Sequence, residues 1–137
     1  MINIYVAAPW AEKEYAKAVA DQLKAAGFGI ASRWLYFEKD AGNGLEIDEA
    51  TLCQEALNDI EDVIGCDAFL LLNTQKRGEE TSGKAVETGI AIATLKPIVI
   101  IGERTNVFHY LNMPRFATVE EAIVWMNSLV AVEASRA

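Results

Sequence analysis

The sequence predicts an α/β fold with a doubly wound sheet of five parallel strands in the order 2-1-3-4-5 and helices on both faces. Apolar runs of strand length alternate along the chain with longer segments of helical periodicity. The clearest case is a βαβ unit, in which residues 67–73 and 96–102 are strands on either side of a polar loop and an apolar helix. This arrangement is flavodoxin-like, and it makes the first strand central.

The first half of the chain predicts two strands, one helix and a long loop. Residues 2–8 form a buried strand, and a helix follows over about residues 11–26. Residues 28–34 form the second strand, and residues 35–44 form a loop long enough to be a lid or a binding loop. The apolar stripe of the helix is Tyr15, Val19, Leu23 and Ala26.

Residues 45–64 form the longest predicted helix. Its core stripe recurs at helical spacing: Leu52, Ala56, Ile60 and Val63. The neighbouring stripe holds three acids: Glu55, Asp59 and Asp62. Acidic stripes usually face water, so we expect Glu55 and Asp62 to be solvated.

The C-terminal part predicts a short strand and a final helix. Residues 115–117 form the strand. Thr118 and Glu121 have capping-box spacing, which predicts a helix over about residues 119–129, and residues 132–137 are expected to fray.

Length and composition indicate one domain over residues 1–137. With 52% hydrophobic and 23% charged residues the chain can bury a single core. No apolar stretch has membrane-spanning length and the chain starts directly as a strand, so a cytoplasmic protein without membrane contact is expected. The net charge of −8 argues against binding a nucleic-acid polymer.

Cysteine and histidine are too sparse for a metal site. Cys53 and Cys66 lie in or at the end of one predicted helix, roughly 20 Å apart, so they cannot pair and are expected to be reduced and half-buried. The single histidine, His109, has no partner at ligand spacing. No metal or other cofactor is expected.

Glu87 is the residue that most needs explaining. It stands about one turn inside the helix that opens at the carboxyl edge of the sheet, where α/β proteins bind ligands. Gly83 and Ala91, four residues to either side, are too small to cover it, which leaves a hollow beside the carboxylate. The alternative is a solvated acid that the helix dipole stabilises. Asp67 begins a strand at the opposite edge, so its expected role is structural.

The loop before Glu87 resembles a phosphate-binding P-loop in spacing only. Residues 78–84 match that motif, but Ala85 replaces the residue that would hold magnesium. Glu79 and Glu80 would also repel a polyphosphate. Nucleoside triphosphate hydrolysis is therefore disfavoured.

The predicted topology allows four side chains to meet in one cleft. Tyr5, Trp10, Trp34 and Glu87 would supply a phenol, two flat aromatic faces and a carboxylate. The alternative for both tryptophans is packing in the core or at an interface.

Three ordered motifs give a more specific indication. Residues 4–10, the pair Asp59 and Asp67, and residues 82–91 followed by Lys96–Ile100 resemble the nucleoside 2-deoxyribosyltransferase family. That family includes the 2′-deoxynucleoside 5′-monophosphate N-glycosidases. The resemblance covers most of the chain.

The resemblance implies catalytic roles for three residues. Glu87 matches the nucleophile that attacks the anomeric carbon, Tyr5 the tyrosine that positions it, and Asp59 an aspartate of the substrate pocket. The predicted helix places Asp59 low on the sheet, so a kinked or shifted helix is required.

The substrate remains open between two branches of the family. Thr81 and Ser82 stand where the transferases carry an acid, and Lys84 at a helix start would favour an anion, as in a nucleotide hydrolase. Pro9 and Trp10 look more like the transferases. The substrate-binding residues implied by fold and resemblance together are Ala8, Trp10, Trp34, Thr81, Ser82, Gly83, Lys84 and Asn106.

In this family a neighbouring subunit completes each pocket. The aromatic residues 107–111 would cross the interface and Asn106 would reach the neighbour's site, which implies a homodimer or a higher homo-oligomer. The expected ligand is a small nucleoside or nucleotide. Transfer of the sugar to another base is the first prediction, hydrolysis of a 5′-monophosphate the second, and a non-catalytic nucleotide-binding module the third.

Overall fold

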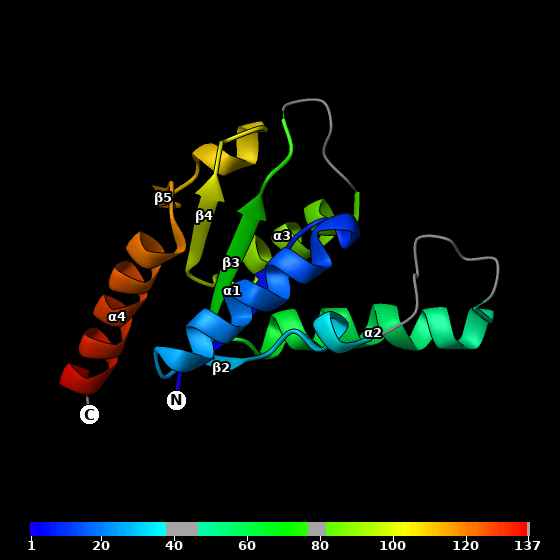
Figure 1. The fold of residues 1–137 in the computed structure, drawn as a ribbon, viewed down its shortest axis with the longest axis horizontal. Coiled ribbons are helices and arrows are strands. Elements are labelled where there is room, and N and C mark those ends of the chain that lie inside the picture. The colour runs from blue at the N-terminus through cyan, green and yellow to red at the C-terminus, as the bar shows by residue number, and fades with distance from the viewer. Residues whose placement is uncertain (38–46, 77–81, 137) are drawn as a thin grey trace.

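The computed structural model describes residues 1–37, 47–76 and 82–136, with side chains through residue 131. Its parallel sheet has the predicted order β2-β1-β3-β4-β5 (Figure 1). The strands are β1 Asn3–Ala7, β2 Gly29–Ile30, β3 Ala68–Asn73, β4 Ile98–Gly102 and β5 Arg115–Phe116. The helices are α1 Lys13–Ala25, α2 Glu49–Gly65, α3 Ser82–Ala93 and α4 Val119–Arg136, with short 3₁₀ helices η1 Trp10–Glu12, η2 Arg33–Tyr36 and η3 Val107–Tyr110.

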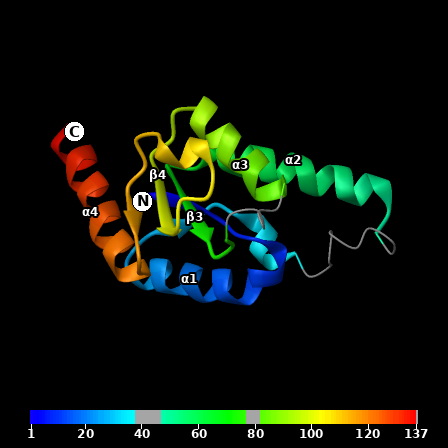
Figure 2. The same ribbon diagram turned by 90° about the horizontal axis from the view of Figure 1, so that it is seen from above.

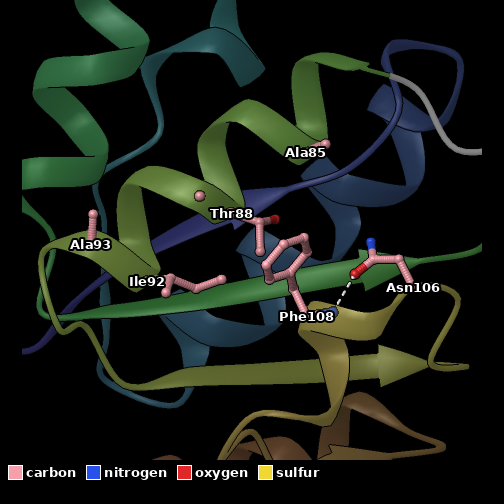
Figure 3. Close-up of a pocket in the computed structure, with 7 residues that line it drawn as sticks. Ala85, Thr88, Ile92, Ala93, Asn106 and Phe108 are labelled. Carbon is pink, nitrogen blue, oxygen red and sulfur yellow. Dashed lines mark hydrogen bonds between the residues drawn. The ribbon is translucent and has the colours of Figure 1, made fainter.

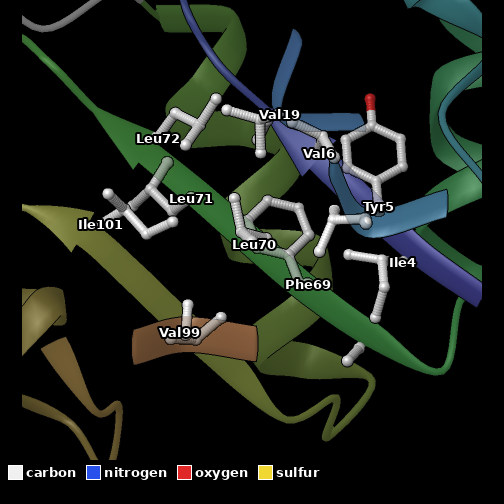
Figure 4. Close-up of a cluster of buried hydrophobic side chains, with 14 of the residues drawn as sticks. Ile4, Tyr5, Val6, Val19, Phe69, Leu70, Leu71, Leu72, Val99 and Ile101 are labelled. Carbon is white, nitrogen blue, oxygen red and sulfur yellow. The ribbon is translucent and has the colours of Figure 1, made fainter. Parts of the chain in front are cut away.

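The core lies on the three central strands (Figure 4). All six residues of β3 are buried, because helices cover both faces of a doubly wound sheet. The ring of Tyr5 on β1 stacks on that of Phe69 on β3, with centroids 5.4 Å apart and an interplanar angle of 3°. This pair lies in direct register across the two strands.

Helices form a layer on each side of the sheet. Figure 2 shows α1 and α4 along one face and α2 with α3 along the other. The buried residues of α1 are Ala16, Val19, Ala20 and Leu23. The predicted stripe was therefore partly wrong, since Tyr15 and Ala26 are exposed. The chain enters α1 through the short 3₁₀ helix η1.

The second strand is shorter than predicted. Only Gly29 and Ile30 pair with β1, and the residues from Arg33 onward form η2. Side chains replace the missing backbone ladder at Val6: its N–H donates to Ser32 Oγ at 3.1 Å, and its carbonyl accepts from Trp34 Nε1 at 2.8 Å. Because both backbone groups of Val6 are satisfied in this way, a longer β2 is unnecessary.

The core stripe predicted for α2 is wrong at three of its four positions. Val63 is buried, but Leu52 is only half-buried and Ala56 and Ile60 are exposed. Figure 1 shows the reason: α2 runs across the strands and extends well past the edge of the sheet. Only its C-terminal turn covers the sheet, and it packs mainly against α3 and η2.

The C-terminal region confirms the predicted capping box. Thr118 Oγ1 accepts from the Glu121 N–H at 3.2 Å and donates to Glu121 Oε1 at 3.0 Å. The helix that it opens continues to Arg136, so its predicted end at about residue 129 is wrong. Within the described part of the chain, every helix is too short or too polar to cross a membrane.

Substitution of Gly102 at the end of β4 is expected to destabilise the protein. Its φ of +116° is one that other residues rarely adopt, and a Cβ there would collide with the Asn73 carbonyl on β3. We expect Gly102→Ala to lower the free energy of unfolding by about 1–3 kcal/mol, measured by urea titration. Gly65→Ala is the matched control, because no atom lies within 4 Å of a Cβ there. Equal stability of the two variants would contradict this reading of Gly102.

Candidate active site

Three ionisable side chains from three elements converge on one face of the sheet. They are Tyr5 of β1, Asp59 of α2 and Glu87 of α3, and each acts electrostatically on the pKa of another. No kink in α2 is needed to place Asp59 there, because α2 is one continuous helix that crosses the strands and packs on α3. The sequence predicted that Asp59 would lie too far from the carboxyl edge of the sheet unless the helix were kinked or shifted. The direction of α2 brings Asp59 to the site without a kink.

Burial makes Glu87 a weak acid. The pKa of its carboxyl group is raised to about 8, first by burial and then by the charge of Asp59, while Tyr5 acts to lower it. The pKa of Asp59 is raised to about 6, also first by burial and then by Glu55 and Asp62, with Arg33 acting in the opposite direction. Two neighbouring carboxyl groups therefore share protons near neutral pH.

Tyr5 is fully buried beside this pair. Burial, followed by the charges of Glu87 and Asp59, raises the pKa of its phenol, so the hydroxyl keeps its proton. The Tyr5 hydroxyl lies near enough to lower the pKa of Glu87, but among the described residues it makes no hydrogen bond of normal geometry. Within the described residues, the Tyr5 hydroxyl and Asp59 Oδ1 are the buried side-chain polar atoms without a hydrogen-bond partner. Such atoms are rare in folded proteins and are characteristic of functional sites.

A cavity of about 220 Å³ opens beside the Glu87 carboxylate. Glu87 and Asp59 are its ionisable lining groups, and Gly83 leaves room at the start of α3. Its other walls are apolar: Ala56, Ile60, Val86 and Ile90. The hollow predicted beside Glu87 is therefore present on the side of Gly83, and the solvated alternative is not supported. Ala91, the other small residue of the prediction, is fully buried and does not line this cavity.

A second cavity of about 320 Å³ lies between α3 and η3 (Figure 3). Thr88 and Asn106 are its polar lining residues, and Phe108 forms one wall. Asn106 Oδ1 accepts from the Phe108 N–H at 2.9 Å, which fixes the amide group at the start of η3. Its remaining lining residues are Ala85, Gly89, Ile92 and Ala93.

The two tryptophans meet each other, and among the described residues neither lines the cavity beside Glu87. Trp34 is buried and bonded to the Val6 carbonyl, as the packing alternative predicted. Trp10 is half-buried, with its ring 6.0 Å from that of Trp34 and Lys13 Nζ 4.1 Å from its centroid. Ala8 is buried just before it.

Lys84 points into the protein, contrary to the expectation that it faces an anion. It is buried, and its Nζ donates to Asn73 Oδ1 at 2.7 Å and to Gln75 Oε1 at 3.2 Å. These bonds tie α3 to the end of β3. Ser82 is exposed at the first position of α3, and Thr81 lies outside the described residues together with the rest of the P-loop-like segment.

The structural role predicted for Asp67 is confirmed, whereas the prediction that Asp62 faces water is wrong. Asp67 Oδ2 accepts from the Asn3 N–H at 2.8 Å, a structural bond at the amino edge of the sheet. Asp62 is not solvated, because Arg33 covers its carboxylate with a contact of 2.9 Å. Sequence reasoning missed Arg33, although a basic residue on the second strand beside a helix with three spaced acids was a usable signal.

Both cysteines are free, as predicted, but neither is half-buried. Cys53 is exposed and Cys66 is buried, where burial raises the pKa of its thiol to about 11. His109 is also buried, and its Nδ1 accepts from the Thr105 N–H at 3.0 Å. Across the described ranges, no cluster of histidine, cysteine and acidic side chains is arranged to hold a metal ion.

Comparison with solved structures shows that the fold is shared with nucleoside-processing enzymes. A 2-deoxyribosyltransferase from the psychrotolerant bacterium Bacillus psychrosaccharolyticus superposes with a TM-score of 0.64 at 19% identity, covering 88% of this chain and 90% of that one. A conserved protein from Enterococcus faecalis V583 gives 0.69 at 17% identity, with 90% and 95% coverage. A CMP N-glycosidase from Clostridium botulinum gives 0.56 at 14% identity, with 91% and 98% coverage.

Comparison with curated protein sequences gives no significant match. The family model described as nucleoside 2-deoxyribosyltransferase matches residues 4–127, a range that includes Tyr5, Asp59 and Glu87. Because that match spans most of the chain, and the sheet order and structural neighbours agree with it, the protein belongs to the nucleoside 2-deoxyribosyltransferase family.

Proposed function

We propose that this protein is a nucleoside 2-deoxyribosyltransferase that uses Glu87 as its nucleophile. The observation that carries the proposal is the Glu87 carboxylate, set in a cavity and coupled to both Tyr5 and Asp59. The family match and the structural neighbours support it, because glycosyl transfer and N-glycosyl cleavage are reactions that a carboxylate nucleophile can perform.

The first half of the proposed reaction forms a covalent sugar ester. The ionised Glu87 carboxylate attacks C1′ of the nucleoside as the C1′–N bond breaks, and the bonding electron pair leaves with the base. Positive charge builds on the sugar ring in between, and the carboxylate stabilises it. Asp59 donates a proton to the departing base. Tyr5 keeps its proton and supplies a hydroxyl that can hold the attacking carboxylate in place.

In the second half, the nitrogen of another base attacks C1′ and releases Glu87. The incoming base gives its proton to Asp59, so the enzyme returns to its starting state. Two displacements at C1′ retain the configuration. If water attacks instead, the same intermediate is hydrolysed.

The protonation states required by this reaction define a pH window. Glu87 attacks when ionised and Asp59 donates when protonated, so the active form of the pair carries one proton. With pKa values of about 6 for Asp59 and about 8 for Glu87, that form prevails between these two limits. In the free protein the shared proton resides mainly on Glu87. A substrate whose C1′ becomes positive favours the ionised form and moves the proton to Asp59.

The alternative proposal is an N-glycosidase acting on nucleoside 5′-monophosphates. The structural neighbour that cleaves CMP supports it, as does the exposed Ser82 at the helix start. The inward position of Lys84 favours the transferase, because its ammonium group already binds Asn73 and Gln75.

We also propose a homodimer in which a second copy covers the Glu87 cavity. The cavity opens on a surface of α2 and α3 with four exposed apolar side chains: Leu57 (53%), Ile60 (40%), Ile64 (50%) and Val86 (60%). Contiguous apolar surface of this kind is typical of subunit interfaces. Asn106 and the exposed residues Val107 and Phe108 of η3 would also contribute. A sedimenting species of monomer mass alone would contradict the proposal.

The decisive experiment is a product assay on a small panel of substrates. The protein is incubated with a deoxynucleoside plus a second free base, with a ribonucleoside plus that base, and with the corresponding 5′-monophosphates alone. A new nucleoside supports transfer, and free base from a monophosphate supports the hydrolase. Ligand-induced thermal stabilisation without any base release would favour a non-catalytic nucleotide-binding module and refute both enzymes.

A further inference from the structure

Arg33 of η2 grips Asp62 of α2 in a fork-like pair. Its Nε lies 2.9 Å from Oδ1 and 3.1 Å from Oδ2, and its Nη2 lies 2.9 Å from Oδ1. The Arg33 backbone N–H also donates to Oδ2, at 3.0 Å. The Asp62 side chain is only 9% exposed, whereas that of Arg33 is 52% exposed. A planar guanidinium with several bonds to one carboxylate fixes direction as well as distance.

This pair lies one helical turn from the catalytic cluster. Asp62 follows Asp59 by three residues, so both project from the same side of α2. Asp59 Oδ1 has no hydrogen-bond partner among the described residues, so it is not fixed by bonds of its own. What directs Asp59 toward Tyr5 and Glu87 is the placement of this turn of α2. Arg33 joins this turn to η2 through its bonds to Asp62.

Arg33 also changes the charge balance around Asp59. Among the residues that the structure describes, the ionisable groups that interact electrostatically with Asp59 are Glu55 and Asp62 on α2, Glu87 on α3, Tyr5 on β1 and Arg33 on η2. Glu55 and Asp62 favour the protonated form of Asp59, and the guanidinium of Arg33 opposes them. The Arg33 guanidinium also lies 3.6 Å from the Glu61 carboxylate, so it contacts both Glu61 and Asp62 of α2.

We propose that Arg33 is a positioning residue of the active site, which through Asp62 holds the turn of α2 that carries Asp59 and places a positive charge beside that turn. This inference rests on the proposed function, in which Asp59 transfers a proton to and from the base. Arg33 acts through Asp62 and Asp59 and does not touch the reacting atoms.

Two substitutions of Arg33 separate the effect of its several hydrogen bonds to Asp62 from the effect of its positive charge. Arg33→Lys keeps a cation but loses the fork, so we expect kcat to fall by about tenfold to a hundredfold, with the pH dependence of kcat/KM unchanged. Arg33→Met loses both, so kcat falls and the acid limb of the profile also moves to higher pH, because the pKa of Asp59 rises. KM should stay near the wild-type value in both variants.

Arg115→Met is the matched control. Arg115 of β5 also pairs with an acid, Glu103 at 2.7 Å, but that acid is not among the groups acting on Asp59 or Glu87. Loss of this pair should reduce stability without moving the pH profile. The inference is overturned if the Arg33 variants lose activity only in proportion to the fall in their melting temperature, which is the result expected for Arg115→Met. It is also overturned if Arg33→Met keeps the pH profile of the wild type.

A second readout keeps this test separate from that of the proposed function. Carbon-13 NMR titration of the Asp59 carboxyl group reports its pKa without any turnover. A higher pKa in Arg33→Met than in the wild type supports the coupling, and an unchanged value refutes it. An inactive wild type would refute the proposed function by itself, whatever the NMR titration shows.

Discussion

Glu87→Gln is expected to lower the rate of base release by about a thousandfold or more, because the amide cannot form the glycosyl ester that the proposed reaction requires. Glutamine has nearly the same shape, so the cavity beside it and the packing of α3 should persist. KM should change much less than kcat, since the lost interaction forms only as the C1′–N bond breaks. The measurement is steady-state release of base from the best substrate of the panel.

Glu120→Gln provides the control for the chemistry of the substitution. Glu120 lies in the first turn of α4, is exposed, and has Gln22 as its hydrogen-bond neighbour at 3.4 Å. The same exchange of carboxylate for amide should leave activity there within about twofold. If Glu87→Gln retained full activity in a folded protein, the nucleophile would have to be sought elsewhere.

Glu87→Gln is also expected to stabilise the protein at alkaline pH. The pKa of Glu87 is about 8 in the folded protein against 4.5 for the ordinary side chain, so the folded state holds the proton more tightly. Stability from this group is fully present below pH 4.5 and is lost as the pH rises through 8. The loss amounts to at most about 5 kcal/mol, because each pKa unit corresponds to about 1.4 kcal/mol.

Glu87→Gln removes this titration, so its advantage over the wild type should grow with pH. The free energy of unfolding of both proteins is measured by urea titration at pH 4.5 and at pH 9. We expect near equality at the lower pH and a variant more stable by a few kcal/mol at the higher one. Glu120→Gln should show no such pH-dependent gain. A constant difference between Glu87→Gln and the wild type at both pH values would contradict the burial of this carboxylate.

The sheet and the position of Glu87 were predictable because both depend on local patterns. The apolar runs of β1, β3 and β4 fix the central strands, and chain order then restricts the topology to very few possibilities. The meeting of Tyr5 with Glu87 follows from that topology, since β1 and α3 are neighbours in space. Asp59 came from the family resemblance, because helical spacing alone placed it at the wrong height.

The parts that could not be predicted depend on contacts between distant residues. The short β2 results from Ser32 and Trp34 reaching Val6, and side-chain bonds of this kind leave no periodic signal. The exposed stripe of α2 follows from the direction of that helix across the sheet, and apolar spacing does not distinguish a face that is buried in the core from one that is exposed. The position of Lys84 at a helix start predicts a cation that faces the binding edge, but its bond to Asn73 holds the ammonium group in the protein interior.

The bonds from Ser32 and Trp34 to Val6 also keep strands of other molecules from pairing with β1 at this position. A two-residue outer strand would otherwise expose an unpaired stretch of β1, and such edges recruit strands from other molecules. A hydroxyl and an indole fill those positions with groups that cannot extend a ladder. Because both polar groups of the Val6 backbone are already bonded, a strand of another molecule cannot extend the sheet from β1 at that residue.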